Sequence, residues 1–309
     1  MPHVIQTQVD CNTAQEFLDA LSPIGSIFRN VKLDAPWLFR GQGQDYPLLP
    51  SALRKTSKLV LLTHRDISDH SERRRAEQDI VIRFFEIADK RGLILPDDSQ
   101  QLRSALETLR SSNYHVVAYE WDVGNVALSL IALAQHYGVP TRLLDWTRQA
   151  FIAAFFAAED ALNPADNLDP SSRLVVWALY FPELGKHSAM HKVNDPIRIV
   201  TAPSATNPNL KAQQGVFTLL HHHHAMDFAR GTAIPMEQML EDLARKAEPE
   251  KDAADALVVN CKLQKFTLPV SEARELLYFL AKLDITPSAV YPGYHSIIRD
   301  LQMQTYYPS

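Results

Sequence analysis

The sequence predicts an α+β fold, with a mixed or antiparallel sheet system and a helical insertion at about residues 60–135. Three observations support this prediction. Strand-like apolar runs lie in residues 1–60 and 140–305, whereas the segment between them follows the 3.6-residue period of helices. Apolar residues make up 46% of the 309, which suffices for a hydrophobic core. We therefore expect a single domain over residues 1–309 whose strands share one sheet system.

The first elements are expected to be a helix and a short strand. Thr13 and Glu16 have the spacing of a capping box ahead of an apolar helix face. Residues 36–39 form an apolar run that predicts a strand, and residues 46–54 predict a turn that enters a brief helix.

The insertion is expected to consist of helices separated by glycines. One helix ends at Gly92, a second begins near Ser99, and a third runs from about Asn125 to Tyr137 and ends at Gly138. Glycine tolerates the left-handed conformation that commonly ends a helix. The basic run at 73–75 is flanked by acidic residues, which predicts a solvated helix face rather than a phosphate-binding patch.

The remainder alternates strands with two helices. The expected strands are Arg142–Trp146, Arg173–Phe181, Ile197–Thr201, Gly215–Leu220 and Val258–Thr267. The expected helices are Phe151–Leu162 and Glu272–Leu283, the second with Ser271 as its cap. Residues 203–212 read as a loop because they combine proline, asparagine and small polar residues.

Composition and charge narrow the function classes. The net charge of −5 supplies no global basic field for nucleic acid. No run of eighteen apolar residues predicts a membrane-spanning helix, and the amino terminus lacks the pattern of a signal peptide. Cys11 and Cys261 match no zinc or redox spacing, so we expect buried thiols and a reducing cytoplasm.

Standard catalytic and metal motifs do not occur. The sequence contains no phosphate-binding P-loop, no GxSxG nucleophile elbow and no HExxH zinc motif. Four consecutive histidines at 221–224 continue a predicted strand, where only alternate ones would share a face. Because three or four convergent ligands are usual for zinc, we interpret this run as a solvated turn and predict no metal site.

The block HYGVPTRLLDWT at residues 136–147 is the densest group of polar residues next to apolar ones. In an extended strand, Asp145 and Thr147 share one face, and Arg142 and Trp146 share the other. One interpretation is structural: Thr147 caps the following helix, and Asp145 pairs with Arg142 or with amides of the first helical turn. The other is that these side chains line a binding pocket.

Two further motifs leave the same choice open. Arg40 ends an apolar strand and Gly41 follows it, which suits an anion site, since a guanidinium forks onto phosphate or carboxylate. The structural alternative is an arginine that binds loop carbonyls. Gln213 and Gln214 precede a predicted strand, where their amides could bind a ribose or bond to neighbouring strands.

Taken together, these fragments resemble the FRG-domain family, which is named for its [FY]RG strand end. The resemblance rests on WLFRGQ at 37–42, PLLPSALR at 47–54, HYGVPTRLLDWT at 136–147, QQGVFT at 213–218 and the closing segment at 285–301. It covers roughly residues 15–303. The resemblance implies a bacterial protein with a tie to toxin or antiphage defence systems.

A second similarity concerns motif order. ADP-ribosyltransferases carry a strand-ending arginine and glycine, then a strand end rich in serine or threonine, then a strand with a glutamine–glutamate pair. Here Arg40, Thr147 and Gln214 follow that order. The similarity implies an ADP-ribosyltransferase-like fold, NAD as the substrate, and a macromolecular acceptor, either protein or nucleic acid.

The similarity also assigns roles to the site residues. Arg40 would hold phosphate or ribose with support from Thr147, and the Gly41 backbone would bond the nicotinamide amide. Asp145 or Gln214 would contact the ribose hydroxyls. Tyr137 or Trp146 would stack on the nicotinamide ring. Gln42 and Arg142 complete the expected cofactor-binding set, and Arg40, Asp145, Thr147 and Gln214 the expected catalytic set.

The pattern departs from such transferases at one position. They place a glutamate on the third strand, where this sequence has Gln213 and Gln214. A glutamine can bond a ribose but cannot stabilise positive charge as a carboxylate does. Either Asp145 takes that role, or the pocket only binds, as in a non-catalytic nucleotide- or protein-binding sensor module. A metal nuclease that uses Asp145 and the histidine run would lack carboxylate partners.

Overall fold

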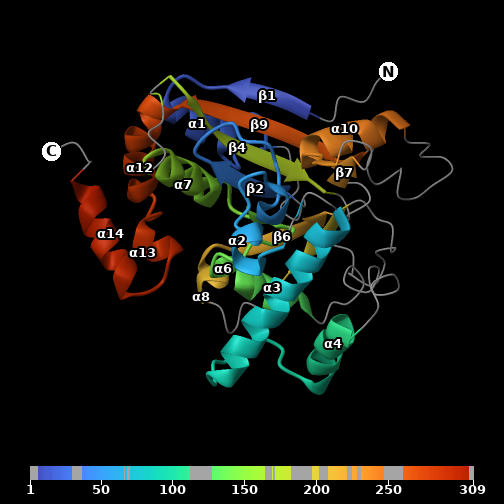
Figure 1. Cartoon of the computed structure of the whole chain (residues 1–309). Coiled ribbons are helices and arrows are strands. Elements are labelled where there is room, and N and C mark those ends of the chain that lie inside the picture. The colour runs from blue at the N-terminus through green and yellow to red at the C-terminus, as the bar shows by residue number, and fades with distance from the viewer. Residues whose placement is uncertain are drawn as a thin grey trace.

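A computed structural model provides the structure of the protein (Figure 1). It describes residues 6–29, 37–65, 67, 70–111, 127–163, 169, 171–181, 197–201, 208–220, 225–227, 231–246 and 260–305. The histidine run at 221–224 lies outside these residues. None of the helices in the described ranges is long and apolar enough to cross a membrane.

A seven-stranded sheet forms the centre of the fold, in the order β1-β9-β4-β2-β3-β6-β5. The strands are β1 (Gln6–Asp10), β2 (Trp37–Gln42), β3 (Leu143–Thr147), β4 (Arg173–Tyr180), β5 (Ile197–Val200), β6 (Gly215–Leu220) and β9 (Lys262–Pro269). The β1–β9 pair is parallel and the others are antiparallel, so the sheet is mixed. The α+β fold class is therefore confirmed. A second, two-stranded antiparallel sheet pairs β7 (Met226–Asp227) with β8 (Thr232–Ala233).

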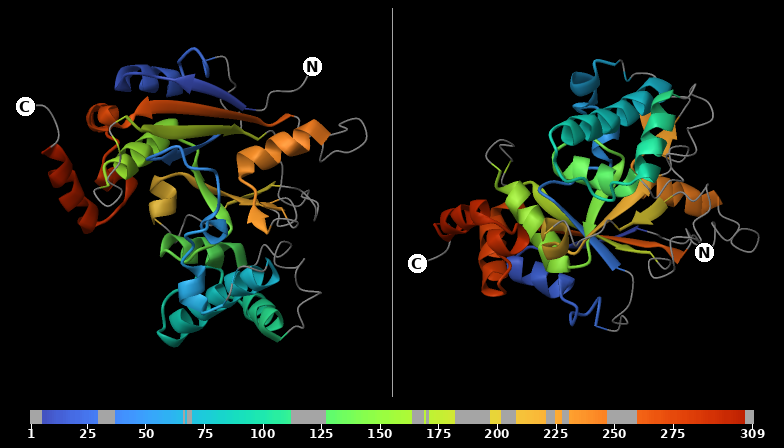
Figure 2. Two further views of the ribbon diagram at one scale, coloured as in Figure 1. Left: turned by 45° about the horizontal axis from the view of Figure 1, so that its top comes forward. Right: turned by 90° about the horizontal axis from the view of Figure 1, so that it is seen from below.

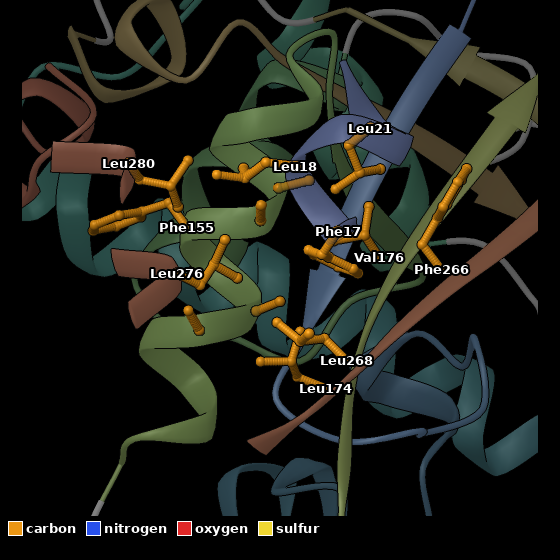
Figure 3. Packing of buried hydrophobic residues seen from close by; sticks show 14 of the residues in the cluster. Phe17, Leu18, Leu21, Phe155, Leu174, Val176, Phe266, Leu268, Leu276 and Leu280 are labelled. Atoms are coloured by element: carbon orange, nitrogen blue, oxygen red, sulfur yellow. The ribbon is translucent and has the colours of Figure 1, made fainter. Parts of the chain in front are cut away.

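Three helices cover one face of strands β9, β4 and β2. They are α1 (Ala14–Leu21), α7 (Ala150–Ala161) and α12 (Ala273–Lys282), and their apolar side chains interlock with those of the sheet (Figure 3). Thr13 caps α1 as the sequence predicts, because its hydroxyl accepts the Glu16 amide hydrogen. Helix α7 contains many alanines, whose small side chains let this helix lie close to strand β2.

The opposite face carries a second apolar cluster. Trp177 of β4 and Trp146 of β3 lie in it together with residues of α10 (Met236–Lys246) and of the short 3-10 helix η1 (Ser51–Leu53). The Leu48 amide donates to the Glu237 carboxylate, which ties the chain before η1 to α10. Strands β2 and β4 are therefore buried on both faces.

A third apolar cluster joins strands β3, β5 and β6 to the helices of the segment predicted to be an insertion. These are α2 (Leu59–Thr63), α3 (His70–Lys90), α4 (Gln100–Ser111) and α6 (Leu128–His136). They lie together below the sheet in Figure 1 and the left view of Figure 2. Gly92 and Gly138 follow α3 and α6 with φ angles of +66° and +85°, which agrees with the predicted helix ends.

Several local predictions are wrong. Residues 208–212, expected to be part of a loop, form α8 (Pro208–Ala212). Ser271 does not cap α12, because a 3-10 turn, η4 (Val270–Glu272), precedes that helix and makes Glu272 its N-cap. The closing segment, for which no element is predicted, forms two helices, α13 (Pro287–Val290) and α14 (Tyr294–Gln304).

The basic run of α3 is also not a solvated face. Arg74 and Glu77 are buried, and Glu77 forms an ion pair with Arg142. Arg73 donates to the backbone carbonyl of Ala52 in η1. Arg73 therefore attaches α3 to η1, and Glu77 attaches it to Arg142 at the start of β3.

Candidate functional site

The three strands that carry the sequence motifs are neighbours in the sheet. Strand β3 pairs with β2 through Phe39 and Thr147, and with β6 through a ladder in which Thr147 lies opposite Gly215. These three residues form one row across the sheet. Arg40 follows Phe39 along its strand, and Gln214 precedes Gly215. The predicted strand end at Arg40 is wrong, because β2 continues to Gln42 and Arg40 lies within it, opposite Trp177 of β4. Thr147 and Gly215 do lie at the paired ends of β3 and β6.

The junction between β2 and β3 is weakly paired. Strand β2 forms six residue pairs with β4, but only the Phe39–Thr147 pair with β3. Arg40 bridges the two strands instead, because its Nη1 donates to the backbone oxygen of Asp145 at 2.8 Å. A side chain therefore provides the link that backbone groups make elsewhere in the sheet.

The Arg40 guanidinium is largely enclosed, with 14% of its side chain exposed. Burial lowers its pKa, the Asp145 carboxylate raises it, the nearby Arg54 lowers it, and Asp160 raises it. Arginine stays protonated under all physiological conditions, so Arg40 is a buried cation. Its Nε is buried and has no hydrogen-bond acceptor within the described part of the chain.

Asp145 is the exposed carboxylate of the site. Its side chain is 61% exposed, and Oδ2 lies 3.5 Å from the Nη1 of Arg40. Its Oδ1 accepts from the Nε2 of Gln135 at 2.5 Å, and the Oε1 of Gln135 accepts from the Thr141 hydroxyl. These bonds hold the carboxylate at the surface in a fixed position. The predicted pairing of Asp145 with Arg142 is wrong, because Arg40 takes that place.

Arg142 points away from this site. Its Nε lies 2.6 Å from the Oε2 of Glu77 on α3, and only 2% and 4% of the two side chains are exposed. Burial raises the pKa of Glu77, and Arg142, Arg73 and Arg74 lower it. The location indicates a structural ion pair that fixes α3 to the start of β3.

Thr147 is buried at the end of β3. Its hydroxyl donates to the Gln213 backbone oxygen at 2.6 Å and accepts the Gln149 amide hydrogen at 3.0 Å. The predicted cap is wrong, since the N-cap of α7 is Gln149, two residues later. The hydroxyl joins the end of β3 to the start of β6.

Gln214 is exposed and adopts a left-handed backbone conformation, with φ at +46°. Its Oε1 accepts from the Nε2 of Gln149 at 3.1 Å, and its backbone oxygen accepts the Arg148 amide hydrogen at 3.3 Å. Gln213 instead donates to the Val290 backbone oxygen. Of the two glutamines, Gln214 is the one at the solvent-facing edge of the row.

Three predicted cofactor-binding residues pack inward. A Cβ added to Gly41 would lie 1.9 Å from the Ala153 oxygen, so this glycine allows β2 to approach α7. The Oε1 of Gln42 accepts from the Trp177 indole at 2.9 Å. The Trp146 indole donates to the Thr218 hydroxyl at 2.9 Å. All three side-chain positions belong to the core.

The C-terminal end of α6 adds exposed groups beside Asp145. Tyr137 is 70% exposed, and its ring makes an edge contact with His136 at 5.2 Å between centroids. The Nε2 of His136 lies 3.1 Å from the Nδ2 of Asn209 on α8. Since Gln135 of the same helix end bonds to Asp145, this end of α6 borders the site.

Two of these residues were not singled out from the sequence. Gln135 lies one position before the HYGVPTRLLDWT block, so its position at the end of a predicted helix was the available signal. Arg54 ends the PLLPSALR segment, and its charge influences Arg40. The described residues contain no group of three potential metal ligands.

The geometry can be compared with known proteins. The model of the FRG domain family matches residues 35–166. The chain carries an FRG domain. The match includes Phe39–Gly41, PLLPSALR and HYGVPTRLLDWT, and ends before Gln213 and the closing helices. No curated protein and no solved structure matches the chain.

Proposed function

We propose that this FRG protein is an NAD-dependent ADP-ribosyltransferase. The observation that carries the proposal is the adjacency of β2, which carries Arg40, β3, which carries Asp145 and Thr147, and β6, which follows the glutamine pair. The motif order of such transferases thus has a counterpart in space. We further propose that it acts in the cytoplasm as a toxin or antiphage effector on a macromolecular acceptor.

The reaction would break the bond between nicotinamide and C1′ of the ribose. Nicotinamide leaves with the bonding electron pair, and an acceptor nucleophile attacks C1′ and loses its proton. Positive charge develops on the ribose, so preorganised negative charge near it would be the largest catalytic contribution. Arg40 would hold the phosphate of NAD that is attached to the same ribose, on the side away from nicotinamide.

Asp145 is the candidate for the missing glutamate. Its carboxylate is exposed, and it is held by Gln135 and Arg40, so it would be oriented before NAD binds. Gln214 and Gln149 carry exposed amides for the ribose hydroxyls. Tyr137 is the aromatic residue for stacking on nicotinamide, since Trp146 is 3% exposed and bonded within the core.

The test is nicotinamide release from NAD, measured by liquid chromatography with and without bacterial lysate as acceptor source. Arg40→Ala and Asp145→Asn should lower the rate by at least a hundredfold, a range typical of losing one charged stabilising group. Arg110→Ala is the control, because Arg110 forms an exposed ion pair on α4. Circular dichroism establishes that each variant is folded. No nicotinamide from the wild-type protein under either condition would refute the proposal.

One observation favours a second candidate, a non-catalytic nucleotide sensor. The start of β6 offers the exposed amide of Gln214, while the Asp145 carboxylate is already bound by Arg40 and Gln135. Such a module should be stabilised by nucleotide without turnover, by about 2.7 kcal/mol at a hundredfold excess over Kd. Ligand-dependent thermal stabilisation with intact NAD recovered afterwards would favour this candidate over the transferase.

A further inference from the structure

Helix α14 leaves a stripe of apolar side chains in solvent. Four of them recur at positions i, i+3, i+4 and i+7, the spacing that places residues on one face of a helix. Each of the four residues is between 46% and 91% exposed. A contiguous apolar patch, unlike a single exposed leucine, marks a surface that another molecule covers. This α14 stripe consists of Tyr294, Ile297, Ile298 and Leu301.

The rest of α14 is fixed to the protein by polar bonds. Arg299 forms an ion pair with Glu159 of α7, and the Tyr291 hydroxyl donates to the same carboxylate at 2.7 Å. Asp300 accepts the amide hydrogen of Ser288 in α13 at 3.0 Å. The helix therefore cannot turn the α14 stripe inward without breaking these bonds.

The exposed face of α14 carries no acid, lysine or arginine. The two such residues of the helix, Arg299 and Asp300, are those bonded inward, and its exposed polar residues are His295, Gln302 and Gln304. The chain has a net charge of −5, so two copies repel each other in most orientations. At the α14 stripe no carboxylate of one helix would face a carboxylate of the other. Two copies can therefore meet here without like charges in the contact.

The area of the α14 stripe suits a symmetric contact. Its side chains expose on the order of 400 Å² of apolar surface, about half of the roughly 800 Å² that each partner of a stable complex buries. In a twofold contact a patch faces its own copy, so one interface removes both stripes from water. Helix α14 lies at the outer edge of the molecule in Figure 1 and in both views of Figure 2, which leaves room for a second copy.

We propose that a second copy of this chain docks on the α14 stripe and that the protein is a twofold symmetric dimer in solution. The two α14 helices pack against each other with Ile297 and Ile298 at the centre. The polar side chains of His295 and Gln302 lie at the rim. This dimer goes beyond the proposed transferase activity and does not depend on it.

The test is sedimentation velocity of the full chain over a range of concentrations. The proteins are wild type, Ile298→Glu, Leu301→Glu and the matched control Ile94→Glu, which places the same charge at a residue that is 90% exposed and follows α3. A glutamate in the stripe should raise the dimer Kd by about a hundredfold or more, because the contact would bury two facing carboxylates. The control should dimerise like wild type. Circular dichroism establishes that each variant is folded.

Disulfide trapping probes the same contact without adding charge. Ile298 lies at the centre of the proposed interface, so Ile298→Cys should link two copies on mild oxidation, whereas Ile94→Cys should not. Cys11 and Cys261 are buried and should add no background.

Three outcomes would overturn the dimer. The first is a wild-type chain that stays monomeric at about 100 μM, well above the Kd of a stable complex, which would leave the stripe to a different protein. The second is a dimer that persists in both stripe variants and is not linked through Ile298→Cys, which would place the interface elsewhere. The third is equal dissociation by Ile94→Glu.

Discussion

The buried ion pair between Glu77 and Arg142 makes a quantitative prediction. Replacing Glu77 by Gln keeps the side-chain volume but removes the negative charge that faces Arg142, Arg73 and Arg74. Removing one partner of a buried pair costs about 3–5 kcal/mol, because a charge is left buried without compensation. Glu77→Gln leaves three guanidinium groups without their shared carboxylate, so we expect a loss of about 3–5 kcal/mol in the free energy of unfolding.

Arg142→Gln should cost less. Glu77 would still face Arg73 and Arg74, so its charge would not be isolated. We therefore expect Glu77→Gln to be the more destabilising of the two substitutions. The control is Glu86→Gln, which removes an exposed ion pair with Arg110 and should change the free energy of unfolding by about 0–1 kcal/mol.

The assay is urea unfolding followed by circular dichroism and by tryptophan fluorescence. Coincidence of the two transitions would justify a single free energy. A Glu77→Gln variant within about 1 kcal/mol of wild type would refute the buried-charge argument. A larger loss for Arg142→Gln than for Glu77→Gln would show that Arg73 and Arg74 do not stabilise Glu77.

Three further predictions concern the motif residues and the thiols. Gly41→Ala should destabilise the protein by about 1–3 kcal/mol or more, because the added Cβ would collide with the Ala153 oxygen. Thermal unfolding measures the loss, and a variant as stable as wild type would contradict the packing argument. Thr147→Val should lower the free energy of unfolding by about 1–3 kcal/mol, because the Gln213 oxygen and the Gln149 amide lose their hydrogen-bond partner. Thr147→Ser keeps the hydroxyl and should retain most of the stability, so equal losses in the two variants would show that the hydroxyl does not matter. Burial raises the pKa of Cys11 from 9.0 to about 11 and that of Cys261 to about 12, so neither thiol should react with Ellman's reagent at pH 8 until urea unfolds the chain. Because the pKa of each thiol is higher in the folded state, the protonated thiols stabilise the fold; this stabilisation is complete below pH 9 and is lost as pH rises through 11 and 12. Rapid labelling of the native protein at pH 8 would contradict the burial of the thiols and their raised pKa values.

The sequence predicted the regular elements well where local signals were strong. Gly92 and Gly138 marked helix ends because their left-handed conformations are a local property of the backbone. The alternation in HYGVPTRLLDWT placed Leu143 and Leu144 on opposite faces, and the structure buries them in different clusters. Thr147 was misread because its hydroxyl serves Gln213, a residue 66 positions away that local pattern does not reveal.

The site was predictable in part. The family motifs indicated Arg40 and Asp145, and these two residues lie together. The charged run of α3 looked like a surface because its acidic neighbours suggested local pairing, whereas Glu77 pairs with Arg142 across 65 positions. Gly41, Gln42 and Trp146 are motif residues that pack in the core. Sequence motifs alone do not separate residues that build a pocket from those that bind in it.

The single backbone pair between β2 and β3 has a consequence for how this protein would respond to a ligand. Strands β1-β9-β4-β2 and strands β3-β6-β5 meet at this border, which is joined by one backbone pair and by the Arg40 hydrogen bond to the Asp145 oxygen. A ligand that binds Arg40 would restrain this border. Ligand binding would then slow amide hydrogen exchange along β2 and β3.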